Sequence, residues 1–338
     1  MPHADSHSSG PSRRELLASG LSLGALALAA PALGGIRVTP SPLPASGPGR
    51  ALRFAHPTDI HVRAKDRGAE GMRACFEHMF KGPDAPGLVI TGGDLPMDSA
   101  STPEKESAEE WGLFLSTIQS TVPKGVPIYH TLGNHDIFGR DKKASETTGN
   151  EPNYGRKWFL KNFGYERTYR SFDQAGWHFI ILDSIDLKPD GDEFTARISG
   201  EQLAWLKDDL AASKGKNTVV VSHVPVMSVA NYFDSDDEEW AKGGPDLKVS
   251  SKRMHVDCRE LEAMFRAHGG IKLCLSGHLH LLDRCTYNAI TYICDGAVSG
   301  AKWKGSKRQT FEGYGLIDLF EDGTFTHQYV AYGWKAGK

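Results

Sequence analysis

Short apolar runs alternate along the chain with longer segments in which apolar residues recur every three or four positions. The short runs are typical of buried strands and predict strands at 52–55, 88–90, 126–132, 177–182, 218–221 and 271–275. The longer segments have helical spacing and predict amphipathic helices near 72–80, 111–118, 203–210 and 257–265. This alternation predicts an α/β domain in which helices separate parallel strands.

Polar and turn-forming residues mark the limits of these elements. Ser199 with Gln202 predicts a capping box at the start of a helix. The polar segment 139–165 is expected to be a loop at the rim of a site. The pattern of 284–334 predicts paired strands, with a hairpin turn at 321–323.

Side chains that bind metals or move protons follow five of the predicted strands, at the point where each strand ends. The motifs are Asp59-Ile60-His61, Gly93-Asp94, Gly133-Asn134-His135-Asp136, Ser222-His223 and His278-Leu279-His280. Because ligands bind beyond the carboxyl ends of parallel strands, these side chains are expected to lie at one edge of the sheet. Taken alone, a histidine at a strand end is usually structural, and Gly-Asn-His-Asp is also an ordinary turn sequence.

Five such strand ends together favour a shared metal centre, because each buried polar group would otherwise need a partner of its own. Histidine, carboxylate and amide ligands without thiolates suit zinc, iron or manganese better than calcium or magnesium. The candidate site residues are Asp59, His61, Asp94, Asn134, His135, Asp136, His223, His278 and His280.

Composition limits the class of protein and of partner. The 338 residues include 39% hydrophobic and 24% charged residues, which is typical of a globular chain large enough to bury a full core. The formal net charge of −3 argues against non-specific nucleic-acid binding, because no basic excess is present to neutralise phosphates. We therefore expect a small substrate and no nucleic acid.

The N-terminal segment has the pattern of an export signal. Arg13-Arg14 precedes a run of small and apolar residues at 18–30, which is too short for a stable membrane span, and Ala30-Pro31-Ala32 follows as a cleavage-like site. This pattern predicts a twin-arginine signal peptide at 1–32 and a Pro/Gly/Ser-rich linker at 33–50, ahead of a domain at 51–338. The expected partner is the twin-arginine export machinery, and the expected location is periplasmic or secreted. A tail with a chance arginine pair is the alternative.

The five cysteines form no Cys-x-x-Cys pair, which argues against a zinc ribbon. In an oxidising compartment Cys285 and Cys294 are the best-placed pair for a disulfide. Buried free thiols are the equal alternative.

The ordered strand-end motifs closely resemble those of the calcineurin-like metallophosphoesterase superfamily. The resemblance runs from Leu52 to His280 and covers Asp59-x-His61, Gly93-Asp94, Gly133-Asn134-His135-Asp136, His223 and Gly277-His278-x-His280. It implies a four-layer α/β/β/α sandwich, with two β-sheets packed face to face, helices outside and the site at the sheet edge.

The resemblance also implies a centre of two metal ions, which iron, manganese or zinc would fill. One ion would be held by Asp59, His61 and His280, the other by Asn134, His223 and His278, with Asp94 bridging the two. Such a centre implies hydrolysis of phosphate esters by in-line attack of a bridging hydroxide. His135 is then free to protonate the leaving group, and Asp136 is expected to orient the His135 imidazole. A carboxylate that caps the following turn is the alternative role for Asp136.

Differences from one branch of the superfamily narrow the class of substrate that we expect. Purple acid phosphatases have glycine in place of His61 and a tyrosine ligand three residues after the bridging aspartate, where this chain has Met97. The Asp-x-His form is more similar to bacterial cyclic-nucleotide and glycerophosphodiester phosphodiesterases. A phosphodiesterase is therefore expected. The alternatives are a phosphomonoesterase, including a protein phosphatase, and a metal-binding protein without catalysis.

Outside the motifs, the glycine-rich segment 296–305 carries Trp303 between Lys302 and Lys304. It is interpreted either as a loop that stacks a base or holds a phosphate, or as a hairpin whose tryptophan covers the sheet edge. His56 and His130 lie within strands and are expected either to be structural or to support the metal ligands without binding metal themselves.

Overall fold

The computed structural model describes residues 49–188, 193–233 and 249–336. The chain divides into two compact units, Met1–Leu43 and Pro44–Lys338, and the structure below is that of the second unit. The predicted signal peptide at 1–32, most of the predicted linker at 33–50 and the acidic run at 234–239 lie outside the described residues.

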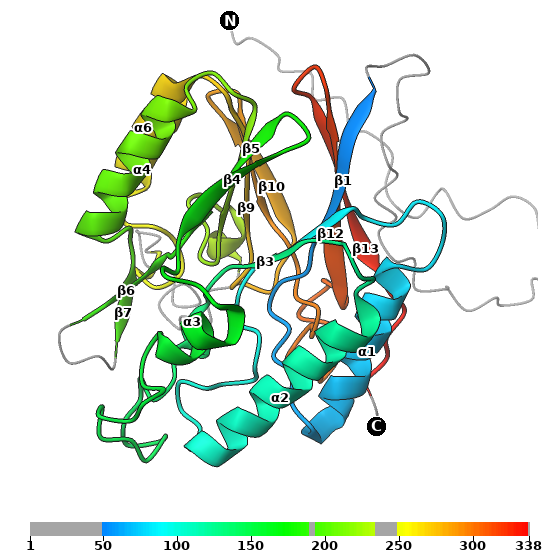
Figure 1. The fold of residues 1–338 in the computed structure, drawn as a ribbon, viewed down its shortest axis with the longest axis vertical. Coiled ribbons are helices and arrows are strands. Elements are labelled where there is room, and N and C mark those ends of the chain that lie inside the picture. The colour runs from blue at the N-terminus through cyan, green and yellow to red at the C-terminus, as the bar shows by residue number, and fades with distance from the viewer. Residues whose placement is uncertain (1–48, 189–192, 234–248, 337–338) are drawn as a thin grey trace, which may run out of the picture. The chain divides into compact units, whose positions relative to one another are not determined.

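The first sheet has five strands in the order β13-β12-β1-β2-β3 (Figure 1). Its strands are β1 (Arg50–His56), β2 (Leu88–Thr91), β3 (Ile128–His130), β12 (Gly313–Phe320) and β13 (Phe325–Ala331). The first three strands are parallel to one another, and β12 is antiparallel to β1. The three parallel strands therefore end at the same edge of the sheet.

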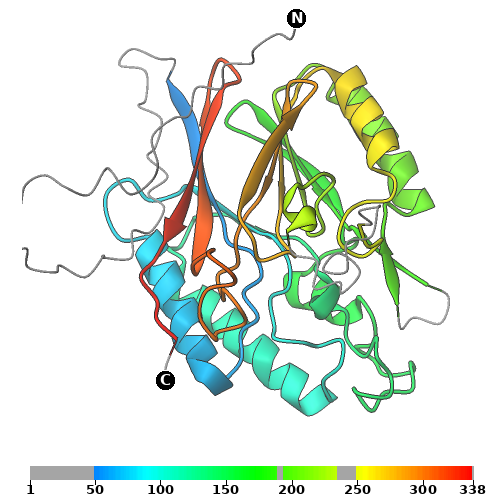
Figure 2. The same cartoon turned by 180° about the vertical axis from the view of Figure 1, so that it is seen from behind.

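The second sheet has six strands in the order β10-β11-β9-β8-β5-β4 and is visible from behind in Figure 2. Its strands are β4 (Arg170–Gln174), β5 (Trp177–Leu182), β8 (Thr218–Ser222), β9 (Ile271–Ser276), β10 (Asp283–Tyr287) and β11 (Ile290–Cys294). The four central strands are parallel, and only the two edge strands run the other way. A separate hairpin pairs β6 (Ile185–Leu187) with β7 (Phe194–Ala196).

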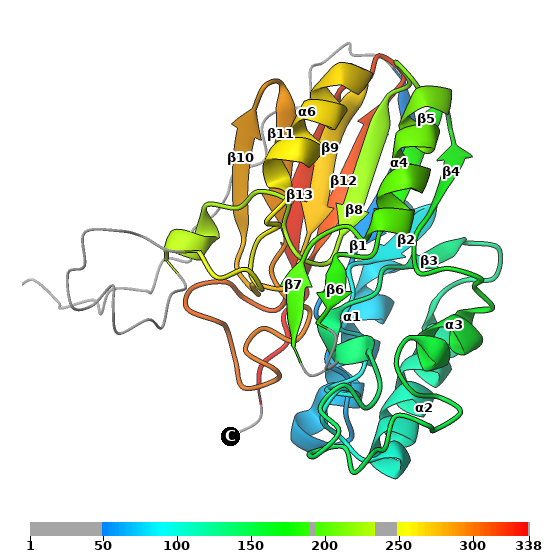
Figure 3. The ribbon, with the colours of Figure 1, turned by 90° about the vertical axis from the view of Figure 1, so that its left-hand side faces the viewer.

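Three apolar clusters join the layers. The central cluster unites residues of both sheets, such as Phe54, Ile90, Phe179 and Val221, so the sheets pack face to face. A second cluster packs the first sheet against α1 (Gly68–Met79) and α2 (Glu104–Thr121), with α3 (Lys157–Phe163) beside α2. A third packs the second sheet against α4 (Gly200–Ala212) and α6 (Cys258–His268), which lie over that sheet in Figure 3. The predicted α/β/β/α sandwich is confirmed.

Three short 3-10 helices complete the described elements. They are η1 (Lys65–Arg67), η2 (Asn134–Asp136) and η3 (Ala230–Tyr232). The second of these contains three of the candidate site residues. No helix in the described part of the chain combines the length and the apolar character that crossing a membrane requires.

Two local predictions are wrong. Ser199 is the N-cap residue of α4, but its side chain makes no capping hydrogen bond. Gln202 instead accepts a hydrogen bond from Asp183 N at 2.9 Å and donates one to Asp183 O at 2.8 Å, because the buried peptide group after β5 needs both partners. The segment 139–165 is not all loop, since it contains α3, whose Trp158 and Phe159 are buried in the core.

The five cysteines are free thiols. In the register of β10 and β11, Cys285 lies opposite Tyr292 and Cys294 lies opposite Asp283, so the two sulfurs do not face each other as a cross-strand pair. The predicted hairpin turn at 321–323 joins β12 to β13, with Gly323 at a φ of 83°.

Candidate metal centre

Nine predicted site residues come together beyond the ends of five parallel strands from both sheets. The strands are β1, β2 and β3 in the first sheet and β8 and β9 in the second. The backbone of five of these residues is left-handed, with φ values of 47° to 68°: Asp59, His61, Asp94, His278 and His280. This conformation is costly for residues other than glycine, and such strain concentrates at functional sites.

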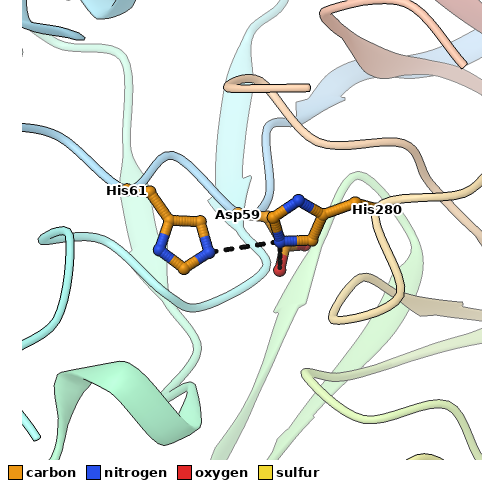
Figure 4. A group of neighbouring side chains, drawn as sticks. All are labelled: Asp59, His61 and His280. Carbon is orange, nitrogen blue, oxygen red and sulfur yellow. Dashed lines mark hydrogen bonds and ion pairs between the residues drawn. The ribbon is translucent and has the colours of Figure 1, made fainter. Parts of the chain in front are cut away.

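The first group of ligand atoms contains Asp59, His61 and His280 (Figure 4). His61 Nε2 and His280 Nε2 lie 3.2 Å apart, and His280 Nε2 lies 3.2 Å from Asp59 Oδ1. All three residues are buried.

The second group contains Asp94, His223 and His278. His223 Nε2 lies 3.2 Å from Asp94 Oδ2, 3.2 Å from His278 Nδ1 and 3.3 Å from Asn134 Oδ1. Asp94 Oδ2 also lies 3.6 Å from His61 Nε2 in the first group. Asp94 therefore stands between the two groups, and Asn134 joins the second.

Backbone carbonyl groups fix the orientation of three of the imidazoles. The Nδ1 atoms of His61, His223 and His280 bond to the carbonyl oxygens of Met97, Gly92 and Gly300 at 2.7–2.9 Å. A carbonyl oxygen only accepts hydrogen bonds, so each Nδ1 carries a proton, and in the neutral ring each Nε2 presents a lone pair to the centre. This arrangement is typical of histidines that bind metal ions.

The residues present fit a metal ion in the first group. His61 Nε2 and His280 Nε2 both carry lone pairs at 3.2 Å, so neither can donate a hydrogen bond to the other. Asp59 Oδ1 is buried and has no hydrogen-bond partner. A cation between these atoms would satisfy all three at once.

The second group also requires positive charge. Burial opposes the ionisation of Asp94, but His223 and the other imidazoles hold the pKa of this carboxyl well below its usual range. Burial lowers the pKa of His223, and the attraction of Asp94 outweighs burial and raises that pKa to about 9. Burial, with His223 adding to it, lowers the pKa of His278 to about 3. The attraction of Asp94 thus favours a second proton on His223, and a bound cation would supply that positive charge instead.

His135 lies beside these groups and is partly open to solvent, with 21% of its side chain exposed. Its ring packs edge-on against His61, with centroids 5.0 Å apart. Its Nδ1 atom bonds to Asp98 Oδ1 at 2.7 Å, so its Nε2 atom is the one left to face a substrate.

The prediction that Asp136 orients His135 is wrong. The Asp136 carboxylate is buried and accepts hydrogen bonds from Gly133 N at 2.6 Å, Asp94 N at 3.0 Å and Leu95 N at 2.8 Å. Burial and the charge of Asp94 raise the pKa of Asp136 to about 8, while the three N–H donors favour its ionised form. Asp136 therefore closes the turn and ties it to the loop of Asp94, as the alternative role proposed.

Sequence reasoning missed Asp98. It comes four residues after Asp94 in a loop, and no motif in the sequence marks it as a partner of His135. The one available signal was that Asp98 follows Asp94 in the loop after β2, which leads to the site.

The cavity at the centre has a volume of about 390 Å³. Its lining residues are Asp94, His135, His278, His280, Ala301, Lys302, Lys304 and Lys307. Trp303 is buried, with 1% exposure, and donates a hydrogen bond from Nε1 to His61 O at 2.7 Å. The interpretation of Trp303 as a base-stacking residue is therefore wrong, whereas its neighbour Lys302 reaches the cavity.

His56 and His130 are buried and belong to neither ligand group, in agreement with the prediction. His56 Nδ1 lies 2.7 Å from Asp295 Oδ2. The His130 ring stacks on Phe163, with centroids 3.8 Å apart.

Comparison with known proteins identifies the class. The family described as Calcineurin-like phosphoesterase matches residues 52–282. A 3′,5′-cyclic-nucleotide phosphodiesterase from Nostoc sp. is 25% identical over 289 residues, which cover 81% of this chain and 90% of that protein. A probable cyclic nucleotide phosphodiesterase from Synechococcus sp. is 25% identical over 244 residues, covering 70% of this chain and 76% of that protein.

Solved structures agree in fold. A dimetal phosphatase from Danio rerio superposes with a TM-score of 0.58 at 14% identity, covering 84% of this chain and 97% of that chain. The chain belongs to the calcineurin-like phosphoesterase family. It is a metal-dependent hydrolase that acts on phosphoric ester bonds, as the resemblance implied.

Proposed function

We propose that this enzyme hydrolyses phosphodiesters at a centre of two metal ions. The observation that carries the proposal is the convergence of two ligand groups on Asp94, with the cavity-facing Nε2 atom of His135 beside them. The relatives from Nostoc and Synechococcus, both described as cyclic-nucleotide phosphodiesterases, support a diester as the substrate.

Each residue has a distinct task in this proposal. Asp59, His61 and His280 would hold one ion, Asn134, His223 and His278 would hold the other, and Asp94 would be shared by both. Bound ions of this kind supply Lewis-acid chemistry, polarising phosphoryl oxygens and lowering the pKa of water.

His135 has the geometry of a general acid. Its Nδ1–H bond to Asp98 leaves Nε2 directed at the cavity, where the leaving-group oxygen of a bound ester would lie. A proton placed on Nε2 would pass to that oxygen as the ester bond breaks, a step that typically contributes about 10²–10⁴-fold to the rate. Asp136 takes no part in this transfer, because both of its oxygens are engaged by backbone N–H groups.

A substrate panel on protein of known metal content tests the proposal. Bis-p-nitrophenyl phosphate, p-nitrophenyl phosphate, cyclic nucleotides and glycerophosphodiesters would be compared by kcat/KM. We expect the diesters to be turned over faster than the monoester. A monoester preference would indicate a phosphomonoesterase, and no turnover of any ester by metal-loaded protein would indicate a binding protein.

We also propose export through the twin-arginine pathway, on the basis of Arg13-Arg14 and the apolar run that follows. The location would be periplasmic or extracellular. Replacement of both arginines by lysine is expected to retain the protein inside the cell in a fractionation experiment. Unchanged export of that variant would contradict the proposed signal.

A further inference from the structure

A loop at 299–305 forms hydrogen bonds with all three residues of the first ligand group. Ser299 Oγ donates to Asp59 O at 2.7 Å, Gly300 O bonds to His280 Nδ1 at 2.7 Å and Trp303 Nε1 donates to His61 O at 2.7 Å. The backbone of this loop is therefore held in a fixed position relative to the first ligand group.

The backbone of this loop is bent so that one residue enters the core and its neighbour enters the cavity. Lys302 and Trp303 both have left-handed backbones, with φ values of 55° and 69°. Trp303 is buried against Gly68 and Gly71 of α1 and meets Trp334 edge-on, with centroids 6.0 Å apart. Consecutive left-handed residues other than glycine are disfavoured, so the packing of Trp303 maintains the strained turn that aims Lys302 at the cavity.

Lys302 lies on the side of the cavity where His135 would release its proton. Lys302 Nζ is 3.5 Å from His135 Nε2, the nitrogen that Asp98 leaves free. The lysine is half-buried, and no carboxylate among the described residues forms an ion pair with it. A cation held at a cavity wall without a carboxylate partner is suited to bind an anionic group of a ligand.

Two more lysines lie at the cavity. Lys304 and Lys307 also line the cavity, and Lys307 Nζ donates to Leu279 O at 3.1 Å, between the two histidines of that motif. Among the described residues that line the cavity, Asp94 is the one carboxylate, and it belongs to the ligand groups. Three lysines therefore line the cavity, although the chain as a whole has a net charge of −3.

We propose that Lys302 binds an anionic substituent on the leaving group of the ester, so that the enzyme selects phosphoesters whose departing alcohol carries a carboxylate or a further phosphate. The inference rests on the proposed function, because it takes the leaving oxygen to lie at His135 Nε2. Lys302 is the specificity-determining residue, and the packing of Trp303 positions it.

Two nearly isosteric substrates test this directly: methyl 3-carboxyphenyl phosphate and methyl 3-carbamoylphenyl phosphate, which differ by one negative charge on the leaving group. The wild-type enzyme is expected to favour the carboxylate ester by about tenfold in kcat/KM, the effect of one charged hydrogen bond. Lys302→Met should bring the ratio close to one, while Lys302→Arg should retain the preference. Lys124→Met, an exposed lysine at the opposite end of β3, is the matched control and should behave as wild type.

The outcomes separate this inference from the proposed function. An unchanged ratio in Lys302→Met, or an equal loss on both esters, would overturn the assignment of Lys302 to the leaving group. Absence of turnover of both esters by metal-loaded wild-type protein would contradict the proposed function instead. In that case calorimetric affinities for the same two esters decide the inference: a charge preference that disappears in Lys302→Met supports it, and equal affinities overturn it.

Discussion

The two nitrogens of His135 have different neighbours, and this difference defines its chemistry. Nδ1 bonds to Asp98 Oδ1 at 2.7 Å, which fixes both the orientation of the ring and the position of its proton. Nε2 faces the cavity beside Lys302. In the proposed mechanism the proton that a substrate would receive is the one on Nε2, and Asp98 orients the ring that carries it.

Asp98→Asn is expected to lower kcat by about tenfold or more. The loss should not exceed the whole contribution of the general acid, which is typically about 10²–10⁴-fold. The loss should be largest for esters with poor leaving groups, because only these depend strongly on protonation. Metal content, measured by elemental analysis, should stay at the wild-type level. Glu109→Gln, which changes an exposed carboxylate on α2, is the matched control. Equal losses on good and poor leaving groups would contradict a role of Asp98 in positioning the acid.

The candidate ligands could be predicted residue by residue, because each follows a strand end within one to five positions. The partner of His135 could not. Whether Asp98 or Asp136 contacts the imidazole depends on the turn at Asn134–Asp136. In this turn the Asp136 carboxylate accepts a hydrogen bond from Gly133 N and forms none with the His135 ring. Asp98 arrives from another loop, 37 positions away in sequence, and only the folded chain brings it there.

A buried histidine far from the metal centre gives a pH dependence of stability. His178 Nδ1 lies 2.7 Å from Asp173 Oδ1 and Nε2 lies 3.0 Å from Asp209 Oδ2, while Lys216 also bonds to Asp173. Burial lowers the pKa of His178, but the hydrogen bonds to Asp209 and Asp173 outweigh burial and raise it.

Because the pKa is higher in the folded state, the stabilisation by His178 is complete below the unfolded pKa of about 6.5 and is lost as pH rises through the folded pKa. The difference in free energy of unfolding between wild type and His178→Gln should therefore shrink as pH increases above about 6.5. Chemical denaturation at a series of pH values measures it. A difference that is independent of pH would show that His178 stays neutral.

At the scale of elements, α1 is shaped to receive the loop that carries Lys302. Gly68 and Gly71 lie on its buried face, and Trp303 packs where their side chains would be. Glycine at these two positions lowers the intrinsic stability of the helix, because glycine is a poor helix former. It also leaves room for Trp303, which donates a hydrogen bond to His61 O.

Two glycine substitutions test this packing. A Cβ at Gly71 would overlap the Trp303 ring, whereas a Cβ at Gly112 in α2 would meet no atom within 4 Å. Gly71→Ala is expected to lower the free energy of unfolding by up to about 2 kcal/mol, because overpacking outweighs the gain in helix propensity. Gly112→Ala should raise it by up to about 1 kcal/mol. Denaturant titration compares the two, and stabilisation by both would contradict close packing at Gly71.

Most elements could be predicted from the period of apolar residues, and β5 coincides with the predicted strand at 177–182. The helix α3 was missed because it has only seven residues in a polar segment, too few for a period to be recognised. The capping box at Ser199 was wrong because Gln202 satisfies the peptide of Asp183, a partner 19 positions away that a local pattern does not contain.

At the scale of the whole molecule, the site exists because two sheets place their parallel strand ends at one edge. The first sheet supplies Asp59, His61, Asp94 and Asn134, and the second supplies the three remaining histidines of the ligand groups. The apolar pattern alone predicted an α/β domain, and the face-to-face packing of two sheets followed only from the resemblance of the motifs. Periodicity reports which face of a strand is buried but not which sheet the strand joins.

The central claim is that two metal ions together catalyse the hydrolysis. A metal titration tests it most directly: metal is added back to chelator-stripped enzyme while hydrolysis of bis-p-nitrophenyl phosphate is followed. Two ligand groups that share Asp94 predict no diester hydrolysis without metal and a rate that reaches its plateau at two equivalents of metal per chain. A plateau at one equivalent, or full activity in the stripped protein, would contradict a catalytic centre of two metal ions.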